Sequence, residues 1–335
     1  MNTRKSRWLV GTLLALPSMA NAANLEVFVG AYGGQSAGPG CSTYSLPSNH
    51  SPYFGASNGV FVPVPGLAPC GVAGSNVAAT SASGPLSNSN AINTSFNAGT
   101  NTVTGSTSAS AQYGLLTSTS DLSFTGASNG NLVKGSEGYG IFADTLTVTS
   151  GSAANGSAGQ IRFTYQLTGS MQMTGSSIFS GTGDVGLWYR FNNGVNAPFF
   201  STVLHSQVTN SAFTPSVILG TGNTMSGITT AAGSLSVNAS MITVLLPFTF
   251  GSAFDFSTGL QTYAQPGSGN TIDMSLFTAY LAGIEVRSGG TPVGFNVSAQ
   301  SGTTYGLNGA VVPIPGAVWL LGSAAGLLWG IRRRG

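Results

Sequence analysis

The chain has 335 residues, and only 5% of them are charged, against roughly 25% in an ordinary soluble domain. Six of its ten basic residues lie close to the two chain ends, which leaves four basic and eight acidic residues between them and a charge of −4 there. That central part has no basic patch, so the composition excludes nucleic acid as a partner.

The first 22 residues, 1–22, have the features of a secretory signal peptide. An apolar segment at Trp8–Leu16 is followed by the small residues of a cleavage site at Ala20–Ala22. We therefore expect export and a mature N-terminus at Ala23. A retained membrane helix is the alternative, but the apolar segment is short for one. The basic residues that precede it are Arg4, Lys5 and Arg7.

Two cysteines, Cys41 and Cys70, follow in the exported part. Two cysteines in an exported chain most often pair, so we expect a Cys41–Cys70 disulfide. The chain-entropy model gives a loop of this length about 3 to 4 kcal/mol of stabilisation. A reactive or metal-binding pair is the alternative, but no CxxC spacing or nearby histidine cluster supports it.

Residues 74–112 consist mostly of Ser, Thr, Asn, Gly and Ala. This composition is typical of a disordered segment or a site of modification, or of strands rich in Ser and Thr. Apolar residues alternate at its end, which favours strands, and we expect short strands with long turns. The alternating residues are Ala109, Ala111, Tyr113 and Leu115.

Apolar residues recur at every second position through much of the remaining chain, and no stretch shows a capped helical period. The clearest runs are Ile161–Leu167, Val185–Phe191 and Thr278–Val286, and each is predicted to be a strand. Short strands separated by Gly, Asn and Ser turns predict an all-β fold, a β-sandwich or jelly roll, over residues 23–305.

Two local features refine this prediction. Gly169-Ser170 interrupts an apolar alternation and is expected to turn the chain as in a hairpin. Ile242–Phe250 is mostly apolar and is expected to be a central strand, in which Pro247 marks a bulge or an edge.

The body has a single tryptophan, Trp188, and it lies in the run Val185–Phe191. If the alternating apolar residues of that run face the core, Trp188 and Arg190 face the other side, followed by Asn192. An outward tryptophan beside Arg and Asn is a candidate sugar-binding platform. The alternative is that a loop covers Trp188, or that it packs on Arg190.

No motif for catalysis or cofactor binding is present. The eight acidic residues are sparse, and no local motif pairs two of them as a glycosidase requires. His50 and His205 have no ligand-spaced partner, so no zinc site is expected, and His205 is expected in a strand. We predict no enzymatic activity, no cofactor and no metal site, and leave open one calcium ion between loops. The acidic residues are Glu26, Asp121, Glu137, Asp144, Asp184, Asp255, Asp273 and Glu285.

The segment Thr271–Tyr305 has the pattern of a hairpin followed by a polar motif. Apolar residues alternate up to the turn residues Ser288-Gly289-Gly290, and they alternate again in Val293–Val297, as in the second strand of a hairpin. Ser301-Gly302-Thr303-Thr304-Tyr305 then closes the segment. The order resembles the last strands of PEP-CTERM sandwich domains, and that resemblance implies a fold and no specific activity.

Residues 306–310 are expected to link the body to an apolar tail, residues 311–335. From Ala317 to Ile331 the tail has no charge, and as a helix this run would be about 22 Å long, shorter than the ~30 Å hydrocarbon core of a bilayer. The positive-inside rule places the following arginines on the cytoplasmic side. The tail is therefore expected to be a stop-transfer or sorting element. Its arginines are Arg332, Arg333 and Arg334.

The tail resembles the PEP-CTERM class of bacterial sorting signals, in the variant that reads V-P-L-P-A and then W-L-hydrophobic-G-S. In this family an exosortase-type membrane enzyme recognises the tail and is held to cleave it. An ordinary anchor helix is the alternative. The matching residues are Val312, Pro313, Ile314, Pro315 and Gly316, then Trp319, Leu320, Leu321, Gly322 and Ser323, then the arginine triplet.

The resemblance and the composition together predict an exported, envelope-anchored, non-enzymatic protein of the surface or extracellular matrix of a Gram-negative bacterium. Its expected partners are an exosortase-type sorting enzyme and the membrane, and an exopolysaccharide is a further candidate. The alternative is a lectin-like carbohydrate-binding protein of the exopolysaccharide matrix. A hydrolase of the matrix polymer is a third class, which would need two convergent carboxylates in a cleft.

Overall fold

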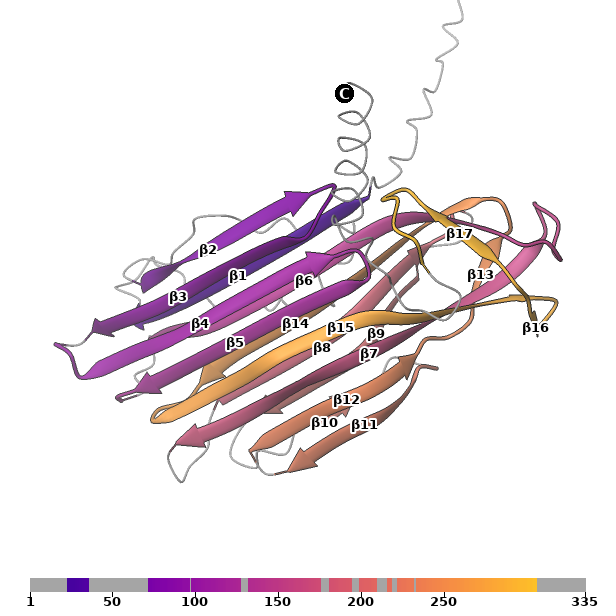
Figure 1. Cartoon of the computed structure of the whole chain (residues 1–335). Coiled ribbons are helices and arrows are strands. Elements are labelled where there is room, and N and C mark those ends of the chain that lie inside the picture. Colours follow the sequence, from indigo (N-terminus) through magenta and orange to yellow (C-terminus); the bar gives the residue numbers. More distant parts are fainter. Residues whose placement is uncertain are drawn as a thin grey trace, which may run out of the picture.

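The computed structural model describes residues 23–35, 72–96, 98–127, 132–175, 181–194, 199–209, 216–218, 222–231 and 233–305. All regular structure in these ranges is β-strand, in two antiparallel sheets packed face to face (Figure 1). The predicted all-β class is confirmed, and the two sheets fit a β-sandwich. The predicted signal peptide, Cys41–Cys70 pair, linker and C-terminal segment lie outside the described residues.

Sheet A has eight strands, and β17 (Asn296–Ala299) lies off its main path, paired with β6. The longest strand of this sheet, β6, pairs with β14 on one side and β1 on the other. From edge to edge the order is β10 (Ser216–Ile218), β9 (Phe199–Thr209), β8 (Gly181–Asn192), β14 (Ala253–Pro266), β6 (Leu132–Thr149), β1 (Asn24–Gln35) and β2 (Val72–Ser81).

Sheet B has nine strands, and two short ones lie off its main path: β13 (Leu246–Thr249) on β7 and β16 (Thr291–Pro292) on β15. From edge to edge the order is β11 (Thr224–Ala231), β12 (Ser234–Ile242), β7 (Ala158–Gly175), β15 (Asn270–Ser288), β5 (Leu115–Thr125), β4 (Asn101–Gln112) and β3 (Leu86–Phe96).

The core lies between the sheets, because every second side chain of a strand points to the same face. On β7, Ile161, Phe163, Tyr165 and Leu167 are all buried. Phe163 stacks on Phe256 of β14 with ring centroids 4.2 Å apart, which joins the two sheets through their inner faces. Fully burying a side chain of this size contributes about 1.5–3 kcal/mol, so these inward rows hold the sandwich together.

The three period-two runs are strands, as predicted: Ile161–Leu167 in β7, Val185–Phe191 in β8 and Thr278–Val286 in β15. The hairpin predicted at Gly169-Ser170 is wrong, because β7 continues through it. A Cβ on Gly169 would lie 2.4 Å from the Phe277 ring, so glycine is required there for packing and not for a turn.

The central strand predicted over Ile242–Phe250 is also wrong, because the chain leaves the ladder in its middle. β12 ends at Ile242, and β13 begins at Leu246 on the other part of β7. The Thr243 hydroxyl accepts a hydrogen bond from the Phe163 N–H at 2.9 Å, which replaces a ladder bond at the break. Pro247 lies in the short, off-path strand β13, in agreement with the edge position expected for it.

The Ser- and Thr-rich region 74–112 forms regular strands, but their lengths differ from the prediction. β2, β3 and β4 have 10, 11 and 12 residues, and the connections between them are short. Ser and Thr are compatible with long strands here because their side chains hydrogen-bond across the ladder. Ser110 Oγ and Thr117 Oγ1, for example, are 2.6 Å apart.

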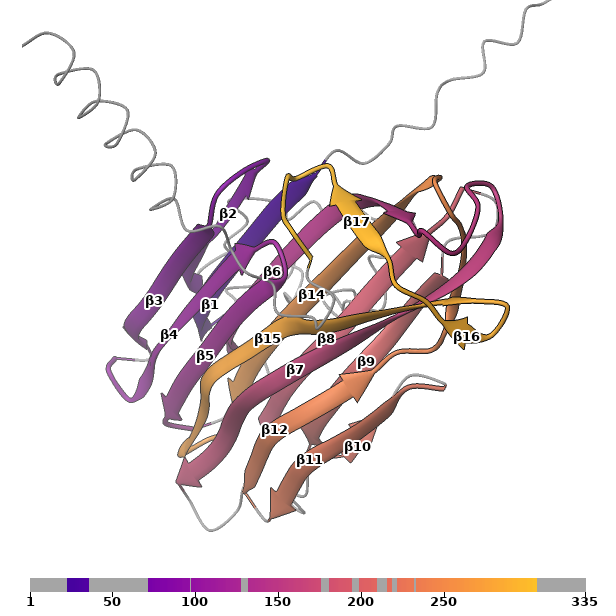
Figure 2. The same cartoon turned by 45° about the vertical axis from the view of Figure 1, so that its right-hand side comes forward.

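The predicted final hairpin exists but is only two residue pairs long. Arg287 and Ser288 pair with Pro292 and Thr291, and the chain then crosses to sheet A as β17 (Figure 2). A bulge near Leu281 also shifts β15, so Tyr280 points outward while Ile284 and Val286 point inward.

The Ser301–Tyr305 motif is held by a buried carboxylate, Asp144 of β6, which is 1% exposed. Asp144 accepts hydrogen bonds from the Ser301 N–H at 3.1 Å, from the Ser301 hydroxyl at 2.5 Å and from the Tyr305 hydroxyl at 2.9 Å. Burial, with the Asp144 charge next in importance, raises the pKa of Tyr305 well above its usual range. The motif therefore fixes the end of the described chain against β6.

Candidate functional site

The residues proposed from the sequence as a sugar platform share the outer face of sheet A. On β8 the side chains of Trp188, Arg190 and Asn192 alternate with four buried core residues and are half-buried on the opposite side. This confirms the orientation expected from the alternation. The core residues of the strand are Val185, Leu187, Tyr189 and Phe191.

Trp188 lies against the backbone of the neighbouring strand and does not stand clear of the sheet. A Cβ added at Gly259 of β14 would lie 2.2 Å from the indole, so the ring covers that glycine. The indole also packs against a cluster formed by Phe28, Tyr139 and Ile141 on β1 and β6. Part of the ring surface is thus used in packing.

Two acidic residues that no sequence motif pairs lie on this same face. Glu137 of β6 and Asp184 of β8 are both in register with Tyr263 of β14, and Gln261 Nε2 donates to Glu137 Oε1 at 2.5 Å. Burial raises the pKa of Glu137 to about 8; the Gln261 bond opposes the shift and the Asp184 charge adds to it. The Glu137 carboxyl is therefore largely protonated at neutral pH.

A protonated carboxyl beside a second acid is a pattern used in glycoside hydrolysis, but such a carboxyl has to reach the substrate. Glu137 is only 2% exposed, so it does not present its proton to a solvent-filled cleft. Glu137 is thus a buried acid of the outer face, hydrogen-bonded to Gln261, and Asp184 nearby is half-buried.

The other acids singled out from the sequence divide between the two sheets. Asp255 of β14 shares the outer face with Arg190 and accepts a hydrogen bond from Thr145 Oγ1 at 2.9 Å. Burial raises the pKa of Asp255, against the Thr145 bond and the Arg190 charge. Asp273 is exposed on the outer face of sheet B, directly across from Asp121. Within the described ranges, no three His, Cys, Asp or Glu residues gather as metal ligands would.

His205 lies in β9, as expected of a strand residue, with Gly186 and Ile218 as its neighbours in the ladder. His50, by contrast, lies outside the described residues.

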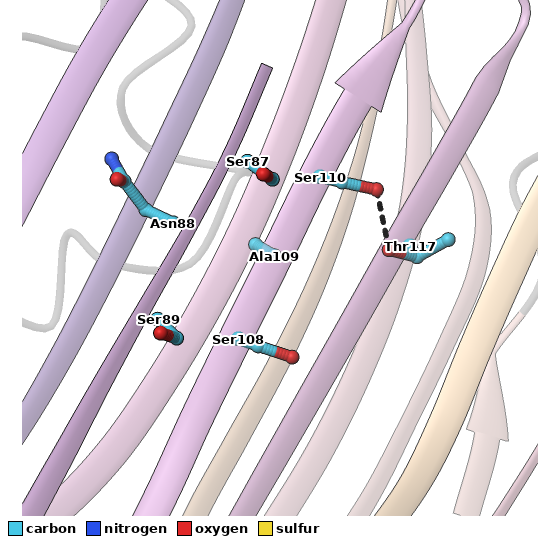
Figure 3. Close-up of a pocket in the computed structure, with 7 residues that line it drawn as sticks. All are labelled: Ser87, Asn88, Ser89, Ser108, Ala109, Ser110 and Thr117. Carbon is cyan, nitrogen blue, oxygen red and sulfur yellow. Dashed lines mark hydrogen bonds between the residues drawn. The ribbon is translucent and has the colours of Figure 1, made fainter. Parts of the chain in front are cut away.

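The outer face of sheet B is a broad surface of hydroxyl and amide groups. Cross-strand hydrogen bonds hold these side chains in rows, including Ser108 to Thr119 at 2.8 Å and Thr271 to Ser123 at 3.0 Å. A shallow hollow of about 440 Å³ opens on β3, β4 and β5 (Figure 3). Its lining residues are Ser87, Asn88, Ser89, Ser108, Ala109, Ser110 and Thr117.

Two large apolar side chains of β15 are exposed on this face, Leu276 at 56% and Tyr280 at 41%. Tyr280 pairs across the strands with Gln166, whose amide donates to Asn238 at 3.1 Å. An uninterrupted period-two strand over Thr278–Val286, as predicted, would place Tyr280 on the same face as Ile284 and Val286, so the sequence does not predict its exposure. The Ala282-Gly283 pair, which breaks the apolar alternation where the bulge lies, is the signal that could have revealed it.

Three charged side chains on the far part of this face form an ion-paired cluster. Glu285 accepts from Arg162 at 2.5 Å and from Arg287 at 2.6 Å. Burial alone would raise the pKa of Glu285, but the bonds from the two arginines outweigh it and lower the pKa.

Comparison with known proteins identifies no family. No family model matches the chain, and no curated protein matches it. Among solved structures, the KRT10-binding region domain of the pneumococcal serine-rich repeat protein PsrP is 10% identical over 64% of this chain and 98% of its own, with a TM-score of 0.13. A structure of the infectious bursal disease virus Gx strain is 9% identical over 77% of this chain and 65% of its own, with a TM-score of 0.09. Scores this low carry no argument about fold or function.

In the part of the chain that the structure describes, no helix has the length and hydropathy of a membrane span.

Proposed function

We propose that the protein is an exported, envelope-anchored, non-enzymatic surface or extracellular-matrix protein of a Gram-negative bacterium. The observation that carries this proposal is the pair of terminal sequence segments, a secretory signal at 1–22 and a sorting-type tail at 311–335, on either side of a two-sheet body. The body supports it, because the outer face of sheet B offers hydroxyl and amide groups to a partner.

The proposed partner in processing is an exosortase-type enzyme that reads the tail through Val312–Pro315, Trp319 and the arginine triplet. Before processing, the tail holds the protein in the inner membrane. After processing, the body carries a net negative charge, since most basic residues lie in the two removed segments.

The test is the intact mass of the protein isolated from native cells. A mature chain that begins at Ala23 and lacks Trp319–Gly335 is expected. A Pro313→Ala/Pro315→Ala variant should stay uncut in the inner membrane, whereas Pro292→Ala, an exposed proline outside the tail, should be processed normally. If the chain still ended in the arginine triplet at steady state, the tail would be an ordinary membrane anchor and not a processing signal.

A second candidate function, lectin-like carbohydrate binding, is favoured by Tyr280. Sugars stack on exposed aromatic rings and hydrogen-bond to amides, and Tyr280 is exposed beside Gln166 on a face with many hydroxyl and amide groups. Trp188 with Arg190 and Asn192 remains the competing site. Binding of the full chain to isolated exopolysaccharide should fall roughly tenfold in Tyr280→Ala and stay unchanged in Leu276→Ala. If binding fell only in Trp188→Ala, the sugar-binding site would lie on sheet A.

A further inference from the structure

The first and last strands of the described body meet on one edge of β6. β1 begins with Asn24 opposite Ala143, and β17 ends with Ala299 opposite Leu146. β14 occupies the other edge of β6 along this stretch, so β17 and β1 lie in line on the same edge, with β17 running towards the start of β1 (Figure 2). The end of β17 and the start of β1 are therefore about 10 Å apart along β6.

The residues that follow β17 are hydrogen-bonded to β6 at the same place. The Gln300 N–H donates to the Thr145 carbonyl at 2.9 Å, and Asp144 accepts from the Tyr305 hydroxyl at 2.9 Å. The chain thus enters the described body and leaves it at one end of the sandwich. This end is termed the exit end and is marked by Asn24, Asp144 and Tyr305.

A short linker joins the exit end to the tail. Residues 306–310 separate Tyr305 from the apolar tail 311–335, and five extended residues span at most about 18 Å. The uncharged run 317–331 is too short to cross a bilayer alone, so a membrane-inserted tail needs the apolar residues from Val311 onward as well. The linker is therefore shorter than the body, because β1, with 12 residues, is about 40 Å long.

The long outer faces of the sandwich carry little that would hold them flat on a bilayer. Surface binding of this kind needs a continuous apolar face or a cluster of basic residues. In the ranges that the structure describes, the exposed large apolar side chains are Val77 of β2 and Leu276 and Tyr280 of β15, on different sheets. The body has four basic residues, and two of them are ion-paired with Glu285.

The charges of the body also differ between its two ends. The half of the sandwich next to the exit end has three arginines against four acids, a charge of −1. The other half has one lysine against three ionised acids, a charge of −2, because Glu137 is largely protonated at neutral pH. An anionic bilayer attracts basic groups and repels acidic ones, so it repels the exit end less. The charged residues of the exit half are Arg162, Arg190, Arg287, Glu26, Asp144, Asp255 and Glu285, and those of the other half are Lys134, Asp121, Glu137, Asp184 and Asp273.

We propose that, in the membrane-anchored form of the protein, the exit end faces the lipid headgroups and the opposite, far end points away from the bilayer. This orientation rests on the proposed function, because it takes the tail to be inserted in the membrane. The linker then holds the exit end close to the bilayer, and the strands stand steeply on it. The outer face of sheet B, with Tyr280 and the hollow, runs along the membrane normal and stays open to a polymer.

Two single-cysteine variants at exposed positions test this orientation. Ser83→Cys lies at the exit end, two residues after β2 ends opposite Leu25, and Ser83 takes part in its turn through backbone groups. Thr125→Cys, at the end of β5, is the matched position at the far end. A donor dye is attached to each cysteine, and the signal is corrected for wild type, which contains Cys41 and Cys70.

The full chain with its tail is placed in vesicles of phosphatidylethanolamine and phosphatidylglycerol that contain an acceptor-labelled lipid. Since β5 spans about 35 Å, energy transfer to the lipid should be at least roughly twofold stronger from Ser83→Cys than from Thr125→Cys. Insertion of about 20 Gly and Ser residues between Leu307 and Asn308 adds roughly 25 Å of flexible chain, so transfer from Ser83→Cys should then fall towards that from Thr125→Cys.

The outcomes separate this orientation from the proposed function. Equal transfer from the two positions in vesicle-bound protein would overturn the orientation and leave the anchoring intact. Unchanged transfer after the linker insertion would also overturn it, because the body would then be held by a lipid contact of its own. A full chain that did not float with the vesicles would instead contradict the anchoring itself, and the orientation with it.

Discussion

The outer faces of the two sheets have opposite character. On sheet A the outward side chains of β1 and β6 are nearly as buried as the inward ones, with Phe28 and Glu137 both 2% exposed. On sheet B the outward side chains of β5 are half-buried or exposed, and all but Leu115 are polar, in strict alternation with buried ones. The part of sheet A at β1 and β6 thus behaves as a sheet covered on both faces, and sheet B as one that faces water.

This difference favours the outer face of sheet B as the surface for the proposed binding. A face with buried aromatics and a protonated acid contributes to stability, whereas a face of ordered, exposed hydroxyls and amides is available to partners. Tyr280 and the hollow on β3, β4 and β5 both belong to sheet B. We therefore expect substitutions on sheet A to change the free energy of unfolding, and substitutions on sheet B to change binding.

The largest expected effect tests whether the outer face of sheet A is a second core. Phe28→Ala should lower the free energy of unfolding by about 3–5 kcal/mol, as expected for a buried phenylalanine. Phe28 contacts the Tyr139 ring at a centroid distance of 5.8 Å, so its removal leaves a cavity in the cluster. Urea unfolding of the full chain is the measurement.

Leu276→Ala, on the exposed face of sheet B, is the control and should change stability by no more than about 0.5 kcal/mol. If Phe28→Ala were as mild as this control, the outer face of sheet A would not be a core, and the contrast between the faces would fail.

A somewhat smaller effect is expected at the carboxylate that holds the end of the described chain. Asp144→Ala removes the acceptor of Ser301 and Tyr305 and should cost about 2–4 kcal/mol, because it leaves buried donors without a partner. Tyr305→Phe, which removes one donor only, should cost about 1 kcal/mol. Equal losses in the two variants would show that the carboxylate acts through Tyr305 alone.

Next in size is a pH effect that depends on Glu137. The folded-state pKa of about 8 lies above the usual value of 4.5, so the folded protein binds a proton that the unfolded chain has lost between these values. The contribution of Glu137 to the free energy of unfolding is fully present below pH 4.5, and it decreases as pH rises towards 8. Between pH 5 and pH 7, the wild type should lose roughly 2 kcal/mol relative to Glu137→Gln, which cannot ionise.

Urea midpoints of both proteins at the two pH values provide the measurement. Gln261 and Asp184, which also act on the pKa of the Glu137 carboxyl, are both retained in the variant. If the free energies of unfolding of the two proteins changed with pH in the same way, Glu137 would ionise with its usual pKa. Its carboxyl would then be open to water.

The sequence predicts the inner core well and the outer faces poorly, for a physical reason. Period two shows which residues share a face, as in Ile161–Leu167, but not whether the opposite face meets water. The nearly continuous apolar run of β1 is the signal for a strand buried on both sides. Bulges in β15 shift the alternation of inward and outward side chains, and a period-two pattern does not predict such shifts. The exposure of Tyr280 therefore does not follow from the sequence pattern. The pairing of Glu137 with Asp184 depends on the order of β6, β14 and β8, which no local pattern contains.

The smallest expected effect concerns the hydroxyl rows of sheet B. Ser110 Oγ and Thr117 Oγ1 are 2.6 Å apart on the half-exposed face, where water competes for both groups. Ser110→Ala, Thr117→Val and the double variant should each change the free energy of unfolding by less than about 1 kcal/mol, with a coupling energy below that value. The same double-mutant cycle applied to Ser118 and Thr262, a fully buried pair 2.7 Å apart between the sheets, should give a clearly larger coupling. Equal coupling energies for the two pairs would mean that the outer face of sheet B is shielded from water in solution, and that its hydroxyl rows are structural instead of available to a partner.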